Sequence, residues 1–278
     1  MPNALPEVQP REGGELSGFT RLNVSAFYSI VARFYDAENQ DKTDDLAMYS
    51  RLAAENRGDI LDVGCGSGRV MIHLAREGHR VFGIDNNRRM LDRLDRKLER
   101  LPPLRDKIRT VDADVLRHDF ERSFGLILLT YNALMHFREQ ERQIALLGRL
   151  RGWLAADGKL VIDLPNAGPV FASEDTDSLT LERVFLDVDS GHMIMLQSVS
   201  ALNRAAQLLH IDWIYDEIDG EGAVKRHLAP HTLRYFFLPE LRLLLERCGF
   251  ALDAVFGDTE GGDYVADSER MIVYASGI

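Results

Sequence analysis

A short segment near residue 60 constrains the fold of this chain more than any other feature. Residues 60–69 read Ile-Leu-Asp-Val-Gly-Cys-Gly-Ser-Gly-Arg, an apolar run followed by three alternating glycines and then by a helical pattern. Glycines let the backbone turn tightly and let a ligand approach the main chain closely. The segment therefore predicts a strand, a glycine-rich turn and a helix at the first crossover of an open parallel sheet, where such sheets bind ligands. A plain structural turn between a strand and a helix is the alternative.

The hydrophobic pattern around this segment predicts an α/β fold. Two helices are expected within residues 25–55, and short apolar runs then alternate with helical patterns, as in the βαβ units of a parallel sheet. The expected strands are residues 60–63, 80–84, 108–111, 125–129 and 159–164, and the expected helices between them are residues 69–77, 87–101 and 139–154.

The pattern changes after this part of the chain. Runs typical of β-strands, separated by turn signals, predict an antiparallel meander over residues 180–236, followed by a helix at 239–247 and two strands at 251–256 and 271–275. We therefore expect a Rossmann-like, doubly wound and mostly parallel seven-stranded sheet. An antiparallel β insertion is expected between its fifth and sixth strands.

These patterns divide the chain into three expected parts. Residues 1–20 are rich in proline and glycine and are expected to form a flexible arm. The core is expected to comprise residues 21–164 and 236–278, and the antiparallel insertion residues 165–235.

The composition excludes several classes of protein. Lys and Arg total 33 against 44 Asp and Glu, a net charge of -11, which argues against a general nucleic-acid binder and against docking on an anionic membrane. The basic segment 88–109 is interpreted as a solvated helix face. The longest uncharged apolar stretch, residues 124–137, is too short to span a bilayer, and the N-terminus has no signal-peptide pattern. The two cysteines, Cys65 and Cys248, form neither a disulfide framework nor a metal-ligand spacing, so we expect a cytoplasmic protein without a metal site.

A second acidic position indicates a nucleoside ligand. Asp85 ends the next expected strand, 17 residues after Gly68, and a carboxylate there can accept two hydrogen bonds from ribose hydroxyls. The loop reads Gly-x-Gly-x-Gly from Gly64 and so departs from the Gly-x-Gly-x-x-Gly fingerprint of dinucleotide-binding proteins. Asp62, two residues before the first glycine, suits a ligand with a cationic ammonium group better than one with a pyrophosphate.

Taken together, these motifs resemble a known family. Asp-Val-Gly-Cys-Gly-Ser-Gly at 62–68 and Gly-Ile-Asp at 83–85 look like the first two motifs of class I S-adenosylmethionine-dependent methyltransferases. The resemblance continues in order with Asp-Ala-Asp-Val at 112–115, Phe-Gly-Leu-Ile-Leu-Leu at 124–129 and Asp-Gly-Lys-Leu-Val-Ile at 157–162. It covers roughly residues 45–164 and 236–276. The chain departs from the family at Gly125, where an aspartate with a structural role is usual.

The resemblance implies a role for each matching residue. The residues implied for the methionine part of the cofactor are Asp62, Thr130 and the backbone of Gly64, Cys65 and Gly66. Those implied for the ribose are Asp85 and Asn86, and those for the adenine are Asp114 and Val115, with Met90 packing on the ring. The implied cofactor is S-adenosyl-L-methionine, with S-adenosyl-L-homocysteine as its product, and no metal is expected.

The segment after the fourth expected strand carries the first candidates for the methyl-acceptor side. It reads Thr-Tyr-Asn-Ala-Leu-Met-His-Phe at 130–137 and resembles amino-sugar N,N-dimethyltransferases, which carry a histidine near the acceptor nitrogen and a Tyr-Asp pair in the N-terminal helix. The matching residues here are His136, a candidate general base, and Tyr35, which Asp36 follows. The alternative for His136 is a histidine that only caps or packs the next helix.

Other polar residues are weaker candidates for the acceptor side. Tyr131 lies in the same segment as His136, and the insertion contributes His210, Trp213, Tyr215, His227, His231, Arg234 and Tyr235. We single out Arg234 and Tyr235 because an arginine could hold an anionic acceptor. Side chains of a strand alternate between its two faces, and the sequence does not show which face is turned to the site.

The sequence thus predicts a methyltransferase that acts on an N or O atom of a small molecule. The insertion is expected to be a lid on the acceptor side and a surface for oligomerisation. Two alternatives stay open at this point, namely a non-catalytic protein that binds S-adenosylmethionine or S-adenosylhomocysteine, and a nicotinamide-dependent oxidoreductase.

Overall fold

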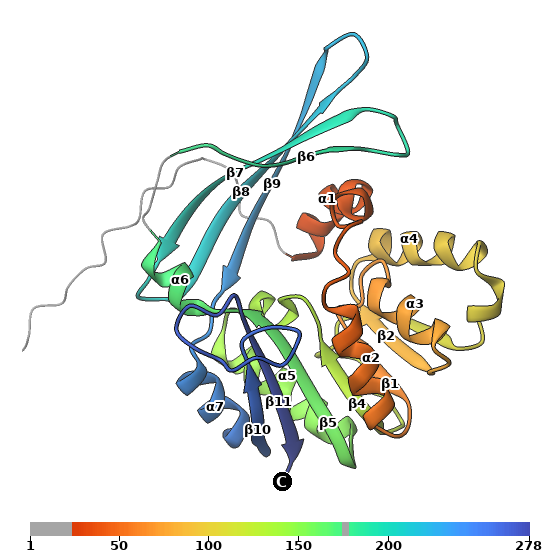
Figure 1. Cartoon of the computed structure of the whole chain (residues 1–278), viewed down its shortest axis with the longest axis vertical. Coiled ribbons are helices and arrows are strands. Elements are labelled where there is room, and N and C mark those ends of the chain that lie inside the picture. The colour runs from red at the N-terminus through yellow and green to blue at the C-terminus, as the bar shows by residue number, and fades with distance from the viewer. Residues whose placement is uncertain (1–23, 174–177) are drawn as a thin grey trace, which may run out of the picture.

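The structure is a computed structural model, and it describes residues 24–173 and 178–278. The expected arm at residues 1–20 lies outside the described residues. Figure 1 shows two sheets, a large one in the lower half of the view and a smaller antiparallel one above it, with helix α1 between the smaller sheet and the helices beside the large one.

The large sheet has seven strands in the order β10-β11-β5-β4-β1-β2-β3. Strands β1 to β5 run parallel to one another, whereas β11 is antiparallel to β5 and β10 is antiparallel to β11. The bounds are β1 (Ile60–Val63), β2 (Val81–Asp85), β3 (Ile108–Asp112), β4 (Phe124–Leu129), β5 (Leu154–Pro165), β10 (Phe250–Phe256) and β11 (Arg270–Gly277). This architecture confirms the expected fold class.

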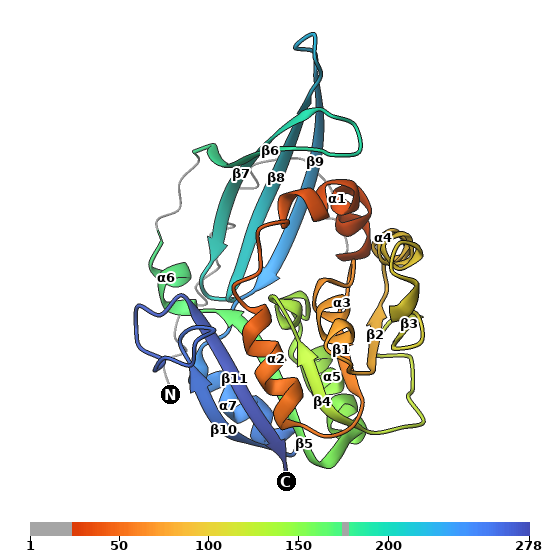
Figure 2. The ribbon, with the colours of Figure 1, turned by 45° about the vertical axis from the view of Figure 1, so that its right-hand side comes forward.

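Helices cover both faces of the large sheet, as Figure 2 shows. All residues of β1 and β4 are buried, which explains why these strands are apolar except at Asp62. Apolar side chains of α5 (Gln140–Trp153) and α7 (Leu238–Arg247) pack in one core with the sheet. Those of α2 (Leu46–Glu55), α3 (Arg69–Arg76) and α4 (Arg88–Glu99) pack in the core on the other face.

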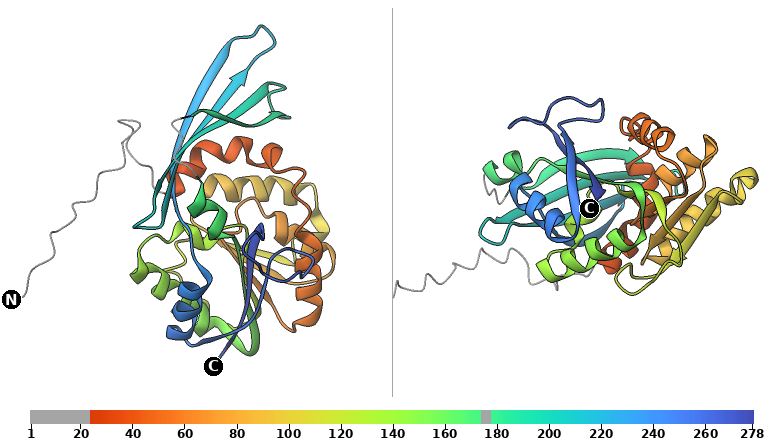
Figure 3. Two further views of the ribbon diagram at one scale, coloured as in Figure 1. Left: turned by 60° about the vertical axis from the view of Figure 1, so that its left-hand side comes forward. Right: turned by 90° about the horizontal axis from the view of Figure 1, so that it is seen from below.

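The smaller sheet lies between β5 and β10 in the chain. Its four antiparallel strands, in the order β6-β7-β8-β9, are β6 (Thr180–Leu186), β7 (Met193–Asn203), β8 (Leu208–Ile218) and β9 (Val224–Arg234). One face packs against α1 (Val24–Glu38), where Phe27, Val31 and Phe34 meet Leu196 and Tyr215. Figure 3 shows α1 running under this sheet. Helix α1 is therefore held between the smaller sheet and the large-sheet core.

The observed elements differ from the expected ones in a few places. Strand β5 begins at Leu154 and not at residue 159, because Leu154 pairs with Phe124 whereas the next pair joins Lys159 to Leu126, so that residues 155–158 bulge out of the ladder. The short helices η1 (Pro102–Leu104), η2 (Ala133–His136) and α6 (Ala167–Ala172) were not expected. Within the described ranges, no helix is both long and apolar enough to cross a membrane.

Candidate active site

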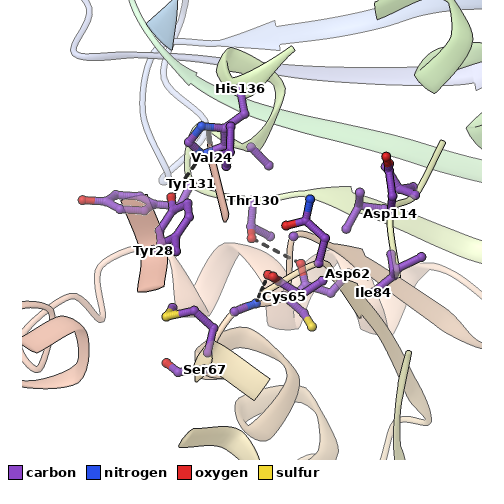
Figure 4. Close-up of a pocket in the computed structure, with 18 of the residues that line it drawn as sticks. Val24, Tyr28, Asp62, Cys65, Ser67, Ile84, Asp114, Thr130, Tyr131 and His136 are labelled. Carbon is purple, nitrogen blue, oxygen red and sulfur yellow. Dashed lines mark hydrogen bonds between the residues drawn. The ribbon is translucent and has the colours of Figure 1, made fainter. Parts of the chain in front are cut away.

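A pocket lies where the carboxyl ends of β1, β2 and β4 meet, next to α1 (Figure 4). The strand order reverses between β1 and β4, and open α/β sheets bind ligands at such a point. The pocket contains about 1070 Å³ of empty space, part of it open to solvent, which matches the upper end of the ~300–1,000 Å³ usual for small-molecule sites. Its lining includes all ten residues that the sequence predicted for the cofactor: Asp62, Gly64, Cys65, Gly66, Asp85, Asn86, Met90, Asp114, Val115 and Thr130.

The glycine loop forms the floor of this pocket. Gly64, Gly66 and Gly68 have φ angles of 75°, 55° and 78°, in the left-handed region that other residues enter at a cost. A Cβ atom on Gly68 would lie 2.4 Å from a methyl carbon of Leu94 on α4, which is too close. All three glycines are thus favoured by the turn, and Gly68 also by its close packing against α4.

Asp85 holds the loop and keeps room for a ligand. Its Oδ2 accepts a hydrogen bond from the Gly66 amide at 2.8 Å, and its Oδ1 accepts one from the Asn87 amide at 2.8 Å. Each carboxylate oxygen has two acceptor sites, so both oxygens keep capacity for another donor. Burial raises the pKa of this carboxyl, although the hydrogen bonds from Asn87 and Gly66 oppose the shift. The geometry fits a carboxylate that accepts hydrogen bonds from a pair of ribose hydroxyls.

Asp62 lies at the end of β1, deep beneath the pocket. It is buried, and its Oδ1 accepts a hydrogen bond from the Thr130 hydroxyl at 3.2 Å. Burial raises the pKa of Asp62 to about 7, because a charged carboxylate is costly in a site of low polarity. A cation beside Asp62 would remove that cost. The site therefore fits the ammonium group of the cofactor's methionine part.

The opposite wall offers groups suited to a planar base. Val115 and Met90 are buried and apolar. Asp114 Oδ1 accepts a hydrogen bond from the Leu116 amide at 2.9 Å, which fixes the orientation of the carboxylate. An apolar slot with one oriented carboxylate can hold an adenine ring and accept a hydrogen bond from its amino group.

We define the acceptor end of the pocket as Tyr28, Tyr35, Tyr131, His136 and Phe137, which all line it. Figure 4 shows Tyr28 on α1 pointing toward His136 on η2, and the Tyr28 Oη lies 3.1 Å from the His136 Nε2. The other nitrogen of His136, Nδ1, lies 3.1 Å from the Nε2 of His231 on β9. Burial lowers the pKa of His136 to about 4. The imidazole is therefore neutral near pH 7, with protein groups at both nitrogens.

Strained backbone after β4 positions the acceptor end. Tyr131 and Asn132 have φ angles of 41° and 70°, which non-glycine residues adopt only when neighbouring contacts enforce them. The Asn132 amide donates to the Asp163 carbonyl at 3.0 Å, and the Arg270 guanidinium donates to both the Asn132 side chain and the Asp163 carboxylate. Hydrogen bonds from Asp163 on β5 and Arg270 on β11 thus stabilise the turn that contains Tyr131 and precedes His136.

The structure places Arg234 and Tyr235 outside the pocket, contrary to our expectation that they would meet the acceptor. Arg234 lies on the opposite face of β9 from His231 because side chains alternate along a strand. Its guanidinium bonds to the Glu240 carboxylate. Tyr235 is 1% exposed and belongs to the large-sheet core. The residue of β9 that does reach the acceptor end is His231.

The sequence did not single out Tyr28 of the acceptor end or His231, which contacts that end through His136. Tyr28 was missed, although it lies seven residues before Tyr35 and therefore on the same side of a helix. His231 was named only as one of several polar residues of the insertion. The structure places His231 on the face of β9 that packs against α1, where its ring stacks on Phe27 and contacts His136.

The comparisons with known proteins agree with this geometry. Residues 60–158 match the methyltransferase domain family. The chain is 28% identical over 220 residues to the cypemycin N-terminal methyltransferase of a Streptomyces species, an alignment that covers 77% of this chain and 81% of that protein. Residues 60–158 therefore form a methyltransferase domain.

Solved structures share the fold of this methyltransferase. The CcbJ methyltransferase from Streptomyces caelestis aligns with a TM-score of 0.71 and 21% identity, covering 92% of this chain and 96% of that one. The amino pentose methyltransferase CalS10 from Micromonospora echinaspora, solved with S-adenosylmethionine bound, aligns with a TM-score of 0.66 and 17% identity over 94% of this chain and all of that one. The CalS10 structure contains the cofactor that the sequence of this chain predicts.

Proposed function

We propose that this methyltransferase transfers a methyl group to an amine nitrogen of a small molecule. The observation that carries the proposal is the chemistry of the acceptor end, whose ionisable groups are three phenols and an imidazole. An alcohol must lose its proton as it attacks, and a histidine with its pKa lowered to about 4 is a weak base for that task. A neutral amine already carries the lone pair that attacks the methyl carbon.

The similar proteins support the same choice of atom. The cypemycin enzyme is named an N-terminal methyltransferase, and CalS10 is described as an amino pentose methyltransferase. Both names denote acceptors that contain nitrogen.

In the proposed reaction, each part of the pocket has a separate task. S-adenosylmethionine, when bound, supplies a methyl group activated by its sulfonium. We propose that Asp62 and Thr130 hold the methionine part, that Asp85 and Asn86 hold the ribose, and that Asp114, Val115 and Met90 hold the adenine. Tyr28 and His136 orient the acceptor nitrogen, and Tyr35 and Tyr131 complete the wall that excludes water. Positioning of this kind supplies a large share of the rate enhancement of such reactions.

The insertion is proposed to be a wall of the acceptor side. Its strand β9 contributes His231, and its face holds α1, which carries Tyr28 and Tyr35. Oligomerisation through the insertion stays a prediction. Leu181, Val184 and Leu186 on β6 are exposed apolar side chains that such contacts would cover.

Pairs of acceptors that differ only in an amine or a hydroxyl group test whether nitrogen is the atom that is methylated. Purified protein would be incubated with S-adenosylmethionine and with amino sugars, amino acids and short peptides, each beside an analogue that has a hydroxyl in place of the amine. We expect S-adenosylhomocysteine release and a methylated product only with the amines, and neither with an Asp85→Ala variant as the control. Methylation of the hydroxyl partner alone would contradict the choice of nitrogen.

A further inference from the structure

Three aromatic side chains from distant parts of the chain form a continuous series at the acceptor end. Tyr28 on α1 contacts the Nε2 of His136, and the Nδ1 of His136 contacts the Nε2 of His231, with 3.1 Å at each step. His231 is 6% exposed, and its ring stacks on Phe27 with 4.1 Å between centroids and 13° between planes. The stacking fixes the plane of the His231 ring, and hence the direction of its Nε2.

Both histidines of the series are neutral near pH 7. Burial lowers the pKa of His136 to about 4 and the pKa of His231 to about 3. A neutral imidazole has one nitrogen that donates and one that accepts. Two proton arrangements along the series therefore satisfy both contacts, with the hydrogen bonds pointing either toward Tyr28 or away from it.

The far nitrogen of His231 distinguishes the two arrangements. His231 Nδ1 is buried and has no hydrogen-bond partner among the described residues. If the bonds pointed away from Tyr28, this nitrogen would carry a proton, and a buried N–H group without a partner is costly and rare. If they point toward Tyr28, the proton of His231 is on Nε2, where His136 accepts it, and Nδ1 keeps only a lone pair. The second arrangement is the more stable one.

We propose that His231 is a positioning residue that holds the proton of His136 on Nε2, so that His136 donates to the Tyr28 oxygen and Tyr28 is the group that meets the acceptor amine. A phenol oxygen has two lone pairs. One accepts from His136, and the other is directed to an N–H of the acceptor. His136 is then a hydrogen-bond donor, and its Nδ1 lone pair is taken up by His231.

This inference rests on the proposed function only for the identity of the acceptor. The tautomer of His136 is a property of the protein alone. It is measured by ¹⁵N NMR of protein with labelled histidine, because protonated and bare imidazole nitrogens have well-separated shifts. The chain has 8 histidines, and the His136→Gln spectrum identifies the signals of His136.

Variants on either side of His136 show which neighbour sets its tautomer. We expect His136 to carry its proton on Nε2 in the parent protein and in Tyr28→Phe, which removes only the acceptor hydroxyl. His231→Leu should give a mixture of tautomers, and His231→Glu should move the proton to Nδ1, because a carboxylate can only accept. His231→Gln, whose amide can donate from a similar place, should restore the parent spectrum.

Each result decides the inference. A parent protein with the His136 proton on Nδ1 overturns it, as does a His231→Leu spectrum that equals the parent's. Stabilisation by S-adenosylhomocysteine shows that each variant is folded, and the parent spectrum is decisive even if one variant fails to fold.

With an amine substrate, His231→Leu should lower kcat/KM by about tenfold, the scale of one buried hydrogen bond, and leave the KM for S-adenosylmethionine unchanged. A confirmed tautomer together with no methylated amine would refute the proposed function and leave the role of His231 intact.

Discussion

The two ends of the pocket are built in different ways. The proposed cofactor end, defined by Asp62, Asp85, Asp114 and Thr130, comes from the carboxyl-terminal parts of β1 and β2 and from the segments after β3 and β4, so each residue is presented by the strand beside it. The acceptor end joins α1, η2 and β9, and the contacts Tyr28–His136 and His136–His231 span 108 and 95 residues of chain. Residues beside neighbouring parallel strands are brought together by the sheet itself, whereas the acceptor end depends on contacts between elements that are distant in the chain.

The largest expected effect tests the cofactor end. Asp85→Ala removes a carboxylate that accepts two backbone amides and, as proposed, the ribose hydroxyls. Hydrogen bonds to charged groups contribute about 1.5–3 kcal/mol each, so the affinity for S-adenosylhomocysteine should fall by about 10²-fold or more. Isothermal titration calorimetry measures it. Asp112→Ala is the matched control. Asp112 is an exposed aspartate at the position of β3 that lies beside Asp85 in the sheet. Equal losses in both variants would refute the ribose role.

The next prediction concerns the acceptor end. Loss of a general base lowers kcat by ~10²-fold or more, whereas loss of one positioning hydrogen bond lowers it by about tenfold. For His136→Ala we expect the smaller loss, because both nitrogens of His136 contact protein groups. Cofactor affinity should stay within a few-fold. Single-turnover methyl transfer across pH distinguishes the two cases, and a loss of 10²-fold would restore His136 as the base.

A third prediction uses the charge of the cofactor. Burial raises the pKa of Asp62 to about 7, whereas a bound ammonium favours the ionised form. Binding of S-adenosylmethionine should therefore release a proton from Asp62 below pH 7. The affinity should fall as the pH is lowered from 7 to 6, by no more than about tenfold. Calorimetry in buffers of different ionisation enthalpy measures the released proton. Asp62→Asn should abolish both the release and the pH dependence, and a proton release that persists in this variant would exclude Asp62 as its source.

The smallest expected effect is at Arg234. This side chain pairs with Glu240 on the face of β9 turned away from His231. Arg234→Gln should therefore leave kcat/KM within about twofold, the scale of a substitution distant from the site. If the KM of an anionic acceptor rose more than tenfold in this variant, Arg234 would have to contact the acceptor, which would contradict the prediction.

Much of the cofactor end could be predicted from the sequence alone. Asp62 and Asp85 lie near the carboxyl ends of strands whose apolar pattern is visible, and the glycine loop and Asp114 come shortly after such strands. In a parallel sheet the carboxyl ends of neighbouring strands meet at one edge, so local order along the chain becomes nearness in space. Helix α5 and the smaller antiparallel sheet were likewise indicated by short-range periodicity.

Only the tertiary structure decided the acceptor end. The sequence could not show which face of β9 is turned to the site, because a period of two is the same on either face, and the structure turns His231 toward His136 and Arg234 toward Glu240. It also did not show that α1 brings Tyr28 to His136, because that contact depends on how the helix packs against the smaller sheet. Local patterns specify single elements, whereas contacts between distant elements depend on burying apolar faces together, and that packing placed Tyr28, His136 and His231 in one series.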